Sequence, residues 1–272
     1  MAVQHHTIEA NGVSLHVVEA GEPQGQPVLW LHGIWDRWLM WQDVVPEIPG
    51  RHFMVEFRGH GESSKPEGAE HYRWKDYADD IVALIDALGF PYVSVVGFSL
   101  GAITATLVAA REPERVARAV AVDPPYHDGV FAAEWMRDVR EIKHLPTEEL
   151  VTMLAFMRPD RDDAEWRREA SWLQMTADGP FDAMIAGTQG EQELEKNLPR
   201  ITQPFLILQA DPTVGGSLSD AMAERALALL PNAHLVRFPG SGHTIAHDQP
   251  EAFVEAVTEF LGRTKDEGLR TK

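Results

Sequence analysis

Residues 92–111 read YVSVVGFSLGAITATLVAAR and set a glycine-flanked serine between two segments of different character. The valine-rich run at 92–96 predicts a buried strand, and residues 102–111 have the composition of a helix. Between them, Gly97-Phe98-Ser99-Leu100-Gly101 matches the pattern G-x-S-x-G, in which the serine occupies a strained turn and the glycines remove side chains that would collide. The stretch predicts that the Ser99 hydroxyl projects at the carboxyl end of a sheet as a candidate nucleophile. The alternative is a glycine-flanked turn whose serine has no chemical role.

Short apolar runs recur on both sides of this stretch. Asn11-Gly12 separates the first two runs, and this dipeptide suits a tight hairpin because both turn residues must accept a positive φ. Further along the chain the runs alternate with helical patterns, which indicates a mostly parallel sheet with helices on its faces. The expected strands are residues 3–9, 13–19, 28–31, 52–57, 93–97, 116–123, 204–211 and 233–238.

The strand signal stops between residues 127 and 199, where the sequence predicts several helices rich in charge, tryptophan and methionine. We expect this segment to be a helical cap over one α/β core domain formed by residues 1–126 and 200–272. The expected fold is an eight-stranded, mostly parallel sheet with an N-terminal antiparallel hairpin. A chain of 272 residues is long enough for one such domain.

Composition excludes several classes of function. Lys and Arg number 24 against 42 for Asp and Glu, a formal net charge of −18, so nucleic acid is not an expected partner. The absence of cysteine excludes disulfides, thiolate metal sites and a cysteine nucleophile. Residues 1–10 lack the apolar core of a secretion signal, which favours a cytoplasmic location. The longest apolar stretch, residues 92–110, is interrupted by glycine, serine and threonine, so no membrane span is expected, and the oligomeric state stays open.

A histidine loop follows the last expected strand. In residues 239–243, Pro-Gly-Ser-Gly-His, two glycines make a tight loop that leaves the His243 imidazole free to reach the carboxyl end of the sheet. His243 is therefore the candidate general base. His247 lies one helical turn further, but no third ligand accompanies the pair, so we expect no metal site.

Two aspartates are candidates for the acid that orients this histidine. Asp211 ends the run at 204–211 and is followed by a loop that contains proline and glycine. Asp123 ends the run at 116–123 and is followed by two prolines. Both give the chain order serine, acid, histidine, so the order does not decide between them.

An oxyanion that forms during attack by Ser99 needs backbone N–H donors. Leu100 would offer one at the N-terminus of the helix, where negative charge is favoured. The loop that begins at residues 30–35, Trp-Leu-His-Gly-Ile-Trp, is suited to supply the other, which we assign to Ile34. We expect His32 in this loop to brace the backbone by hydrogen bonding and not to act as the base.

The chain resembles the alpha/beta-hydrolase superfamily over residues 3–261. The matching pieces are His32-Gly33, the Arg-Gly-His-Gly-Glu-Ser segment at 58–63, the Ser99 turn, Asp211-Pro212 and Gly242-His243. The resemblance implies that the acid follows the strand at 205–210, about thirty residues before the histidine. Asp211 lies 32 residues before His243, so the resemblance favours Asp211 over Asp123.

Two positions bear on the chemistry that the resemblance implies. Family members often carry aspartate where this chain has Glu56, a position that we interpret as structural. Related dehalogenases and epoxide hydrolases use an aspartate where this chain has Ser99, so attack on an ester or amide carbonyl is expected. The resemblance implies no metal or organic cofactor.

Large apolar side chains near these motifs indicate an apolar substrate pocket. The expected lining residues are Trp35, Trp38, Phe98, Trp135 and Met157. We expect an uncharged ester or lactone as substrate, because the net charge disfavours anions unless a local arginine such as Arg137 or Arg158 overrules it. A carbon-carbon bond hydrolase, an amidase or a perhydrolase with the same triad remain alternatives, as does a small-molecule receptor on the same fold.

Overall fold

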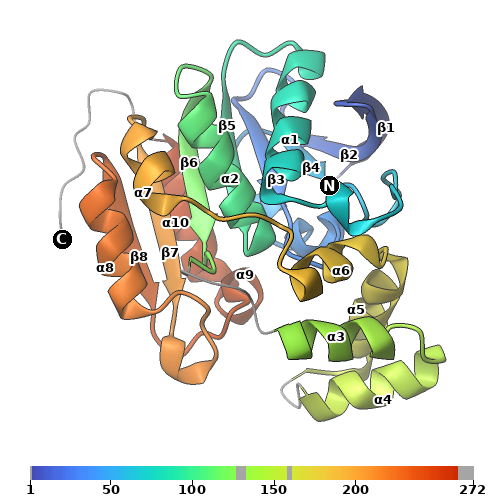
Figure 1. The fold of residues 1–272 in the computed structure, drawn as a ribbon. Helices are drawn as coiled ribbons and strands as arrows, with labels where there is room; N and C mark the ends of the chain where they lie inside the picture. The colour runs from blue at the N-terminus through green and yellow to red at the C-terminus, as the bar shows by residue number, and fades with distance from the viewer. Residues whose placement is uncertain (1, 127–132, 158–160, 263–272) are drawn as a thin grey trace.

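The computed structural model describes residues 2–126, 133–157 and 161–262, except for the side chain of Met157. Eight strands form one sheet in the order β1-β2-β4-β3-β5-β6-β7-β8 (Figure 1). The strands are β1 (Val3–Ala10), β2 (Val13–Gly21), β3 (Pro27–Leu31), β4 (Arg51–Val55), β5 (Val93–Phe98), β6 (Val116–Val122), β7 (Phe205–Ala210) and β8 (Ala233–Phe238). β2 runs antiparallel to β1 and β4, and all other neighbours are parallel. The expected eight-stranded, mostly parallel sheet is confirmed.

The N-terminal hairpin closes at Asn11-Gly12, as the dipeptide predicts. Both residues have a positive φ, 50° and 76°, and the flanking Ala10 and Val13 form the last pair of the ladder. This geometry follows the right-handed twist of the two strands. The antiparallel part of the sheet is therefore confined to the edge that the hairpin forms.

Helices cover both faces of the sheet. The α-helices are α1 (Trp74–Leu88), α2 (Leu100–Arg111), α3 (Ala133–Ile142), α4 (Thr147–Met157), α5 (Asp163–Met175), α6 (Gly179–Ala186), α7 (Leu194–Asn197), α8 (Asp220–Leu229), α9 (Ile245–Asp248) and α10 (Pro250–Gly262). The 3-10 segments are η1 (Trp38–Trp41), η2 (Val45–Glu47), η3 (Ala69–His71), η4 (Leu198–Arg200) and η5 (Pro212–Val214). Helices α1, α2 and α8 share one hydrophobic cluster with the sheet, and α10, η1 and η2 share the other.

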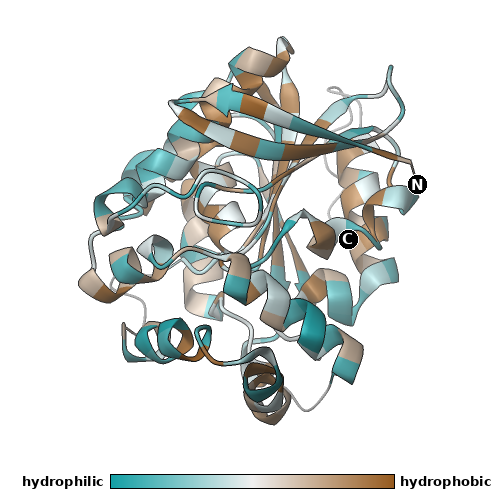
Figure 2. Ribbon diagram, turned by 90° about the vertical axis from the view of Figure 1, so that its right-hand side faces the viewer, coloured by the Kyte–Doolittle hydropathy of each residue, from teal (hydrophilic) through white to brown (hydrophobic). Residues whose placement is uncertain are grey.

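Side chains alternate between these two clusters along each central strand. In β5, Val93 and Val95 face α1 and α2, whereas Val96 and Phe98 face the α10 side. Because both faces are covered, the central strands are mostly apolar, and brown segments lie inside the molecule in Figure 2.

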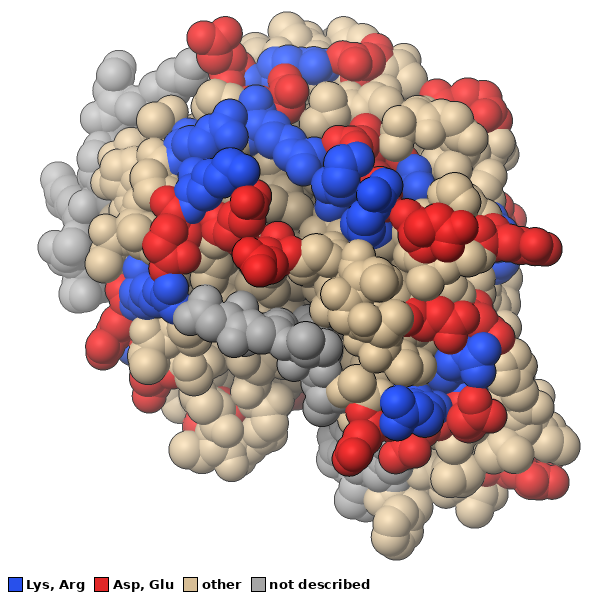
Figure 3. Space-filling model, in the orientation of Figure 1, with Lys and Arg blue, Asp and Glu red and all other residues tan. Residues whose placement is uncertain are grey.

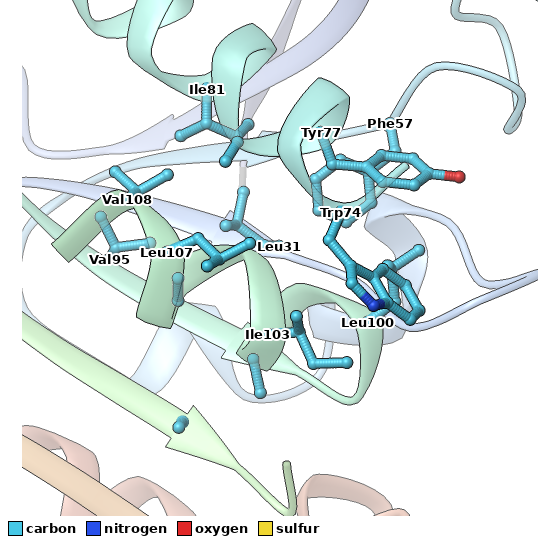
Figure 4. Packing of buried hydrophobic residues seen from close by; sticks show 14 of the residues in the cluster. Leu31, Phe57, Trp74, Tyr77, Ile81, Val95, Leu100, Ile103, Leu107 and Val108 are labelled. Carbon is cyan, nitrogen blue, oxygen red and sulfur yellow. The ribbon is translucent and has the colours of Figure 1, made fainter. Parts of the chain in front are cut away.

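The contact between α1 and α2 shows how the first cluster is packed (Figure 4). Tyr77 and Ile81 of α1 lie above Leu31 of β3, while Ile103 and Leu107 of α2 approach from the other side. These residues repeat every three or four positions, which places them on one face of each helix. This packing between α1 and α2 holds the N-terminus of α2, and with it the Ser99 turn, over the middle of the sheet.

Two acidic residues of α1, Asp76 and Asp80, are buried. Asp80 has no exposed surface and accepts hydrogen bonds from Asn11 and from Nε of Arg58, the latter at 2.6 Å. A buried carboxylate requires such partners because removal from water disfavours its charge. The Asp80–Arg58 pair ties the 58–63 segment to α1 and to the hairpin.

Helices α3–α6 occupy the insertion between β6 and β7. Figure 1 shows them together at the lower right, on the side where the parallel strands end. Helix α3 packs against α6, α4 packs against α5, and α6 also contacts η3 of the core. The last part of the insertion, α7 and η4, returns to the core and packs against α2.

The acidic excess is not spread evenly over the surface. Lys and Arg gather in an arc over one face in Figure 3. Five basic residues line one surface hollow: Arg73, Lys75, Arg111, Lys196 and Arg200. Four of the five are paired with carboxylates: Asp76, Asp79 or Glu193. None of the helices within the described ranges has the length and apolar composition needed to cross a membrane.

Candidate active site

The structure places Ser99 in a strained turn between β5 and α2, as its flanking glycines predict. Its φ of 52° and ψ of −114° lie outside the regions that L-residues prefer, and its N–H donates to the Val122 carbonyl oxygen at 3.1 Å. A Cβ on Gly97 would lie 2.0 Å from the Gly101 oxygen, and one on Gly101 would lie 2.2 Å from the Leu31 oxygen. Both glycines are therefore required by space, since the turn presses α2 against β3 and β5.

His243 follows β8 and contacts the carboxylate of Asp123 at the end of β6. The distance between His243 Nδ1 and Asp123 Oδ2 is 2.6 Å. Because a carboxylate only accepts, Nδ1 carries the proton and Nε2 keeps its lone pair. The imidazole also packs on Phe98, the residue before Ser99, with a ring-centroid separation of 4.6 Å. The structure thus brings the His243 ring beside the Ser99 turn, with Nδ1 held by Asp123.

Asp123 is enclosed by hydrogen-bond donors. Its side chain has no exposed surface, and it accepts from the N–H groups of Ala210, Ser217 and Leu218 as well as from His243. Its φ of 41° is unusual for a residue other than glycine and marks a backbone held in a sparsely populated region. Three backbone donors and one imidazole keep this carboxylate fixed.

The expectation that Asp211 faces His243 is wrong. The Asp211 carboxylate accepts from the N–H and hydroxyl of Thr213 and from the Gly240 N–H, and these bonds lower its pKa. The glycine-containing loop after β7 reaches the histidine. It brings the N–H groups of Ser217 and Leu218 to Asp123, whereas the Asp211 side chain caps η5. Ser217 Oγ also lies 3.1 Å from His243 Nδ1.

The two expected oxyanion donors lie on elements that adjoin Ser99. Leu100 is the first residue of α2, so its N–H has no carbonyl partner one turn earlier in the helix. Ile34 belongs to the loop after β3, where a Cβ on Gly33 would approach the Asp36 carboxylate and the Phe98 ring. Trp35 adopts a positive φ of 54°, a further sign that this loop is held in a special conformation.

His32 braces this loop, as expected. Its Nδ1 donates to the Gly33 carbonyl oxygen at 2.7 Å, and its Nε2 accepts from the Phe57 N–H at 3.1 Å. Complete burial lowers the pKa of His32 to about 4, so it is neutral near pH 7. With both ring nitrogens engaged, it is not available as a base.

Glu56 anchors the loop after β3 through its contact with Arg37. This fully buried carboxylate accepts from Arg37 Nε at 2.6 Å and from the Glu62 N–H at 2.7 Å, and it lies 2.9 Å from His16 Nδ1. Burial alone would raise the pKa of Glu56. The hydrogen bonds from His16, Arg37 and Glu62 outweigh this effect and lower the pKa to about 2. Sequence reasoning identified the position as structural but missed its partner Arg37, which directly precedes η1.

A hollow with a cavity volume of about 60 Å³ lies between η1, α9 and the insertion, and its lining includes the chain neighbours of Ser99, Asp123 and His243. Of the expected pocket residues, Phe98 lines it. Its other apolar walls include residues beyond the five expected ones. They are Leu39, Met40, Trp41, Val44, Val122, Trp172 and Ile245.

The other expected pocket residues have different surroundings. Trp35 contacts Trp135 of α3 at 5.3 Å between ring centroids and stacks on Phe181 of α6. Trp38 meets the ring of His5 edge-on. The side chain of Met157 lies outside the described residues.

His247 has carboxylate partners and not a metal-like arrangement. Its Nε2 contacts Glu165 of α5, and its Nδ1 lies 3.3 Å from Asp248. These two groups raise the pKa of His247. Among the described residues no cluster of three His, Asp or Glu side chains has the spacing of a metal site. His247 instead ties α9 to the insertion.

Comparisons with known proteins agree with this architecture. Residues 28–256 match the Alpha/beta hydrolase family. A 2-(acetamidomethylene)succinate hydrolase of Mesorhizobium japonicum is 28% identical over 266 residues, which cover 93% of this chain and 94% of that protein.

Solved structures share the fold. The crystal structure of E-2-(acetamidomethylene)succinate hydrolase superposes with a TM-score of 0.81 at 23% identity, covering 96% of this chain and 100% of that one. The enol-lactonase from Burkholderia xenovorans LB400 gives a TM-score of 0.80 at 19% identity, covering 95% and 100%. The chain therefore belongs to the alpha/beta hydrolase family and is a hydrolase.

Proposed function

We propose that the protein is a serine hydrolase that cleaves carboxylic esters or lactones, with Ser99 as nucleophile, His243 as base and Asp123 as the orienting acid. The 2.6 Å contact between His243 and the buried Asp123 carries this proposal. It fixes the tautomer in which Nε2 accepts a proton, on a ring that packs beside the Ser99 turn.

The reaction follows from these positions. His243 Nε2 removes the Ser99 hydroxyl proton as Oγ bonds to the carbonyl carbon, and the carbonyl oxygen becomes an oxyanion. The Leu100 and Ile34 N–H groups stabilise that oxyanion, which is favoured at the N-terminus of α2. The carbon-oxygen bond to the alcohol then breaks, and the imidazolium returns its proton to the leaving oxygen. In a lactone the alcohol stays attached to the acyl chain.

Water completes the cycle. His243 takes a proton from water as the water oxygen attacks the acyl-enzyme, and the Ser99 oxygen leaves with that proton. The net change is one water consumed, one carboxylic acid and one alcohol formed. Asp123 does not need to change its protonation state, because its role is to hold Nδ1–H and stabilise the imidazolium.

Labelling with a fluorophosphonate tests the nucleophile directly. We expect mass spectrometry to find the adduct on Ser99 of the native protein and no adduct on Ser99→Ala, whose turnover of an aryl ester should fall by about a millionfold. A variant that kept more than about a hundredth of the native turnover would show that Ser99 is not the nucleophile.

A panel of esters, lactones, amides and carbon-carbon substrates distinguishes the rival chemistries of the same triad. A burst of alcohol followed by steady turnover would support the enzyme. A stoichiometric burst without turnover on any substrate class would favour a receptor on this fold.

A further inference from the structure

A buried arginine lies in the wall of the hollow that adjoins the triad. Arg161 stands two residues before α5, and only 8% of its side chain is exposed. Its Nη2 donates to the Thr244 hydroxyl at 3.0 Å, and its Nη1 reaches Glu169 Oε2 at 3.4 Å. Its Nε is buried and has no hydrogen-bond partner among the described residues. The guanidinium thus retains an unused donor inside a cavity.

An unused donor of this kind points to a ligand. Buried N–H groups of charged side chains are normally satisfied, because an unpaired one has lost its water without compensation. The carboxylate that contacts Arg161, that of Glu169, is at the long limit of a hydrogen bond and occupies one of five N–H groups, and Glu165 acts on the guanidinium only through longer-range electrostatics. A ligand oxygen in the hollow would accept a hydrogen bond from the unused N–H of Arg161.

The position of Arg161 relates it to the reaction. Thr244, its hydrogen-bond partner, follows His243 in the chain, and Phe98 and Val122 of the same hollow precede Ser99 and Asp123. A molecule that reaches Arg161 while its carbonyl lies at Ser99 would therefore run along the apolar wall of the hollow.

Other charged groups limit which anion fits. Arg168 also lines the hollow, lies over the Trp172 ring and is 3.9 Å from Glu165, a carboxylate that His247 already contacts. Asp36 and Asp43 line the hollow too, and Asp43 is exposed to solvent. These acids disfavour a doubly charged group such as phosphate and leave a singly charged carboxylate as the better match to the planar guanidinium.

We propose that Arg161 binds a carboxylate of the substrate, so that the preferred substrate is an ester or lactone carrying a free carboxylate separated from the reacting carbonyl by an apolar chain. This proposal rests on the proposed function. The proposed substrate carries a negative charge, whereas the net charge of the protein led us to expect an uncharged one. Arg161 would be the arginine that overrules the net charge. Arg137 lies exposed on α3, and Arg158 is outside the described residues.

The test compares monoethyl esters of succinate, glutarate and adipate with the ethyl esters of the corresponding monocarboxylic acids. We expect the native protein to prefer at least one acid-bearing ester, and Arg161→Gln to lower that preference in kcat/KM by about tenfold or more. Arg161→Lys should retain part of it, because the charge remains but the planar fork is lost.

Arg167→Gln is the matched control. Arg167 also belongs to the insertion, but its guanidinium is exposed and pairs with Glu148 and Asp163 on the outer side. The same change of charge there should leave the preference unchanged. If Arg167→Gln reduces the preference as much as Arg161→Gln, the effect is long-range and the proposed contact is wrong.

Binding to the Ser99→Ala protein provides a readout without turnover. We expect the preferred monoethyl ester to bind at least tenfold more tightly than its neutral counterpart, and Arg161→Gln to remove this difference. Equal binding and equal turnover of both esters by the native protein would overturn the carboxylate site. A native protein that hydrolyses neutral esters through Ser99 without such a preference would leave the proposed function standing, whereas absence of Ser99 labelling would refute that function itself.

Discussion

His243 and Asp123 share a 2.6 Å contact between Nδ1 and Oδ2, although 120 residues separate them in the chain. The contact spans the carboxyl end of β7, because Asp123 directly follows β6 and His243 follows β8. It is completed by N–H groups of the loop that follows β7, so three consecutive strand ends converge on one carboxylate. The loop after β7 thus serves the triad region through its backbone.

Replacing each aspartate by its amide tests this arrangement. We expect Asp123→Asn to lower turnover by about ten-thousandfold, because the amide no longer fixes the proton on Nδ1. Asp211→Asn should keep turnover within about threefold, since its carboxylate holds Thr213 and Gly240, whereas the imidazole Nδ1 is held by Asp123. Both variants are compared by steady-state kinetics after circular dichroism shows that they are folded.

The reverse pattern would contradict the structure. A crippled Asp211→Asn beside a normal Asp123→Asn would mean that the histidine loop pairs differently in solution. Equal, moderate losses in both variants would indicate an effect on the loop between them and not on the imidazole.

The sequence was sufficient to predict the sheet and the Ser99 turn because both depend on local patterns. Alternating apolar runs determine strands, and Gly97 and Gly101 are required by contacts within one turn and its neighbours. The choice between Asp123 and Asp211 depends on how a long-range hydrogen-bond network closes. Both residues end strands, and only the contacts of their oxygens distinguish them.

The pocket could be predicted less well for the same reason. An aromatic residue near the Ser99 turn or the loop after β3 can line the hollow or pack against another aromatic ring. Trp35 packs against Trp135. Arg161 gave no signal in the sequence, because a charged residue in a helical segment is normally solvated. Its burial results from the packing of the insertion against α9.

Glu56→Gln should destabilise the protein substantially. The change leaves the buried Arg37 guanidinium without its 2.6 Å counterion, and breaking one partner of a buried pair costs about 3–5 kcal/mol. Glu62→Gln is the control, since this second carboxylate near Arg37 is mostly exposed and its loss should cost less than about 1 kcal/mol. Urea unfolding measures both values. A Glu56→Gln variant as stable as the control would show that Glu56 does not anchor the loop after β3.

Gly97→Ala should also destabilise the fold, although Gly97 does not need a positive φ. Its new methyl group would lie 2.0 Å from the Gly101 carbonyl oxygen, and overpacking of this kind costs typically about 1–3 kcal/mol or more. Gly262→Ala, at the end of α10 where nothing lies within 4 Å, is the matched control and should be neutral or slightly stabilising. Thermal unfolding of the two variants gives the comparison. Equal melting temperatures would mean that α2 can move away from β5 at little cost.

Acid should weaken the fold before the carboxylates titrate, because burial lowers the pKa of His32, His52 and His60 and favours their neutral form. Burial lowers the pKa of His32 to about 4 and that of His60 to about 3, from an ordinary value of 6.5. Between pH 6 and 5 the unfolded chain therefore takes up protons that the folded protein does not, so the free energy of unfolding falls as the pH falls. Each histidine contributes at most about 1.4 kcal/mol per pH unit.

Asparagine can replace the hydrogen bond from His60 Nδ1 to the Arg58 carbonyl oxygen but does not titrate. We thus expect His60→Asn to reduce the slope of unfolding free energy against pH by up to one proton in this range, as measured by urea unfolding at closely spaced pH values. An unchanged slope would mean that His60 is protonated in the folded protein, and the assigned neutral state would be wrong.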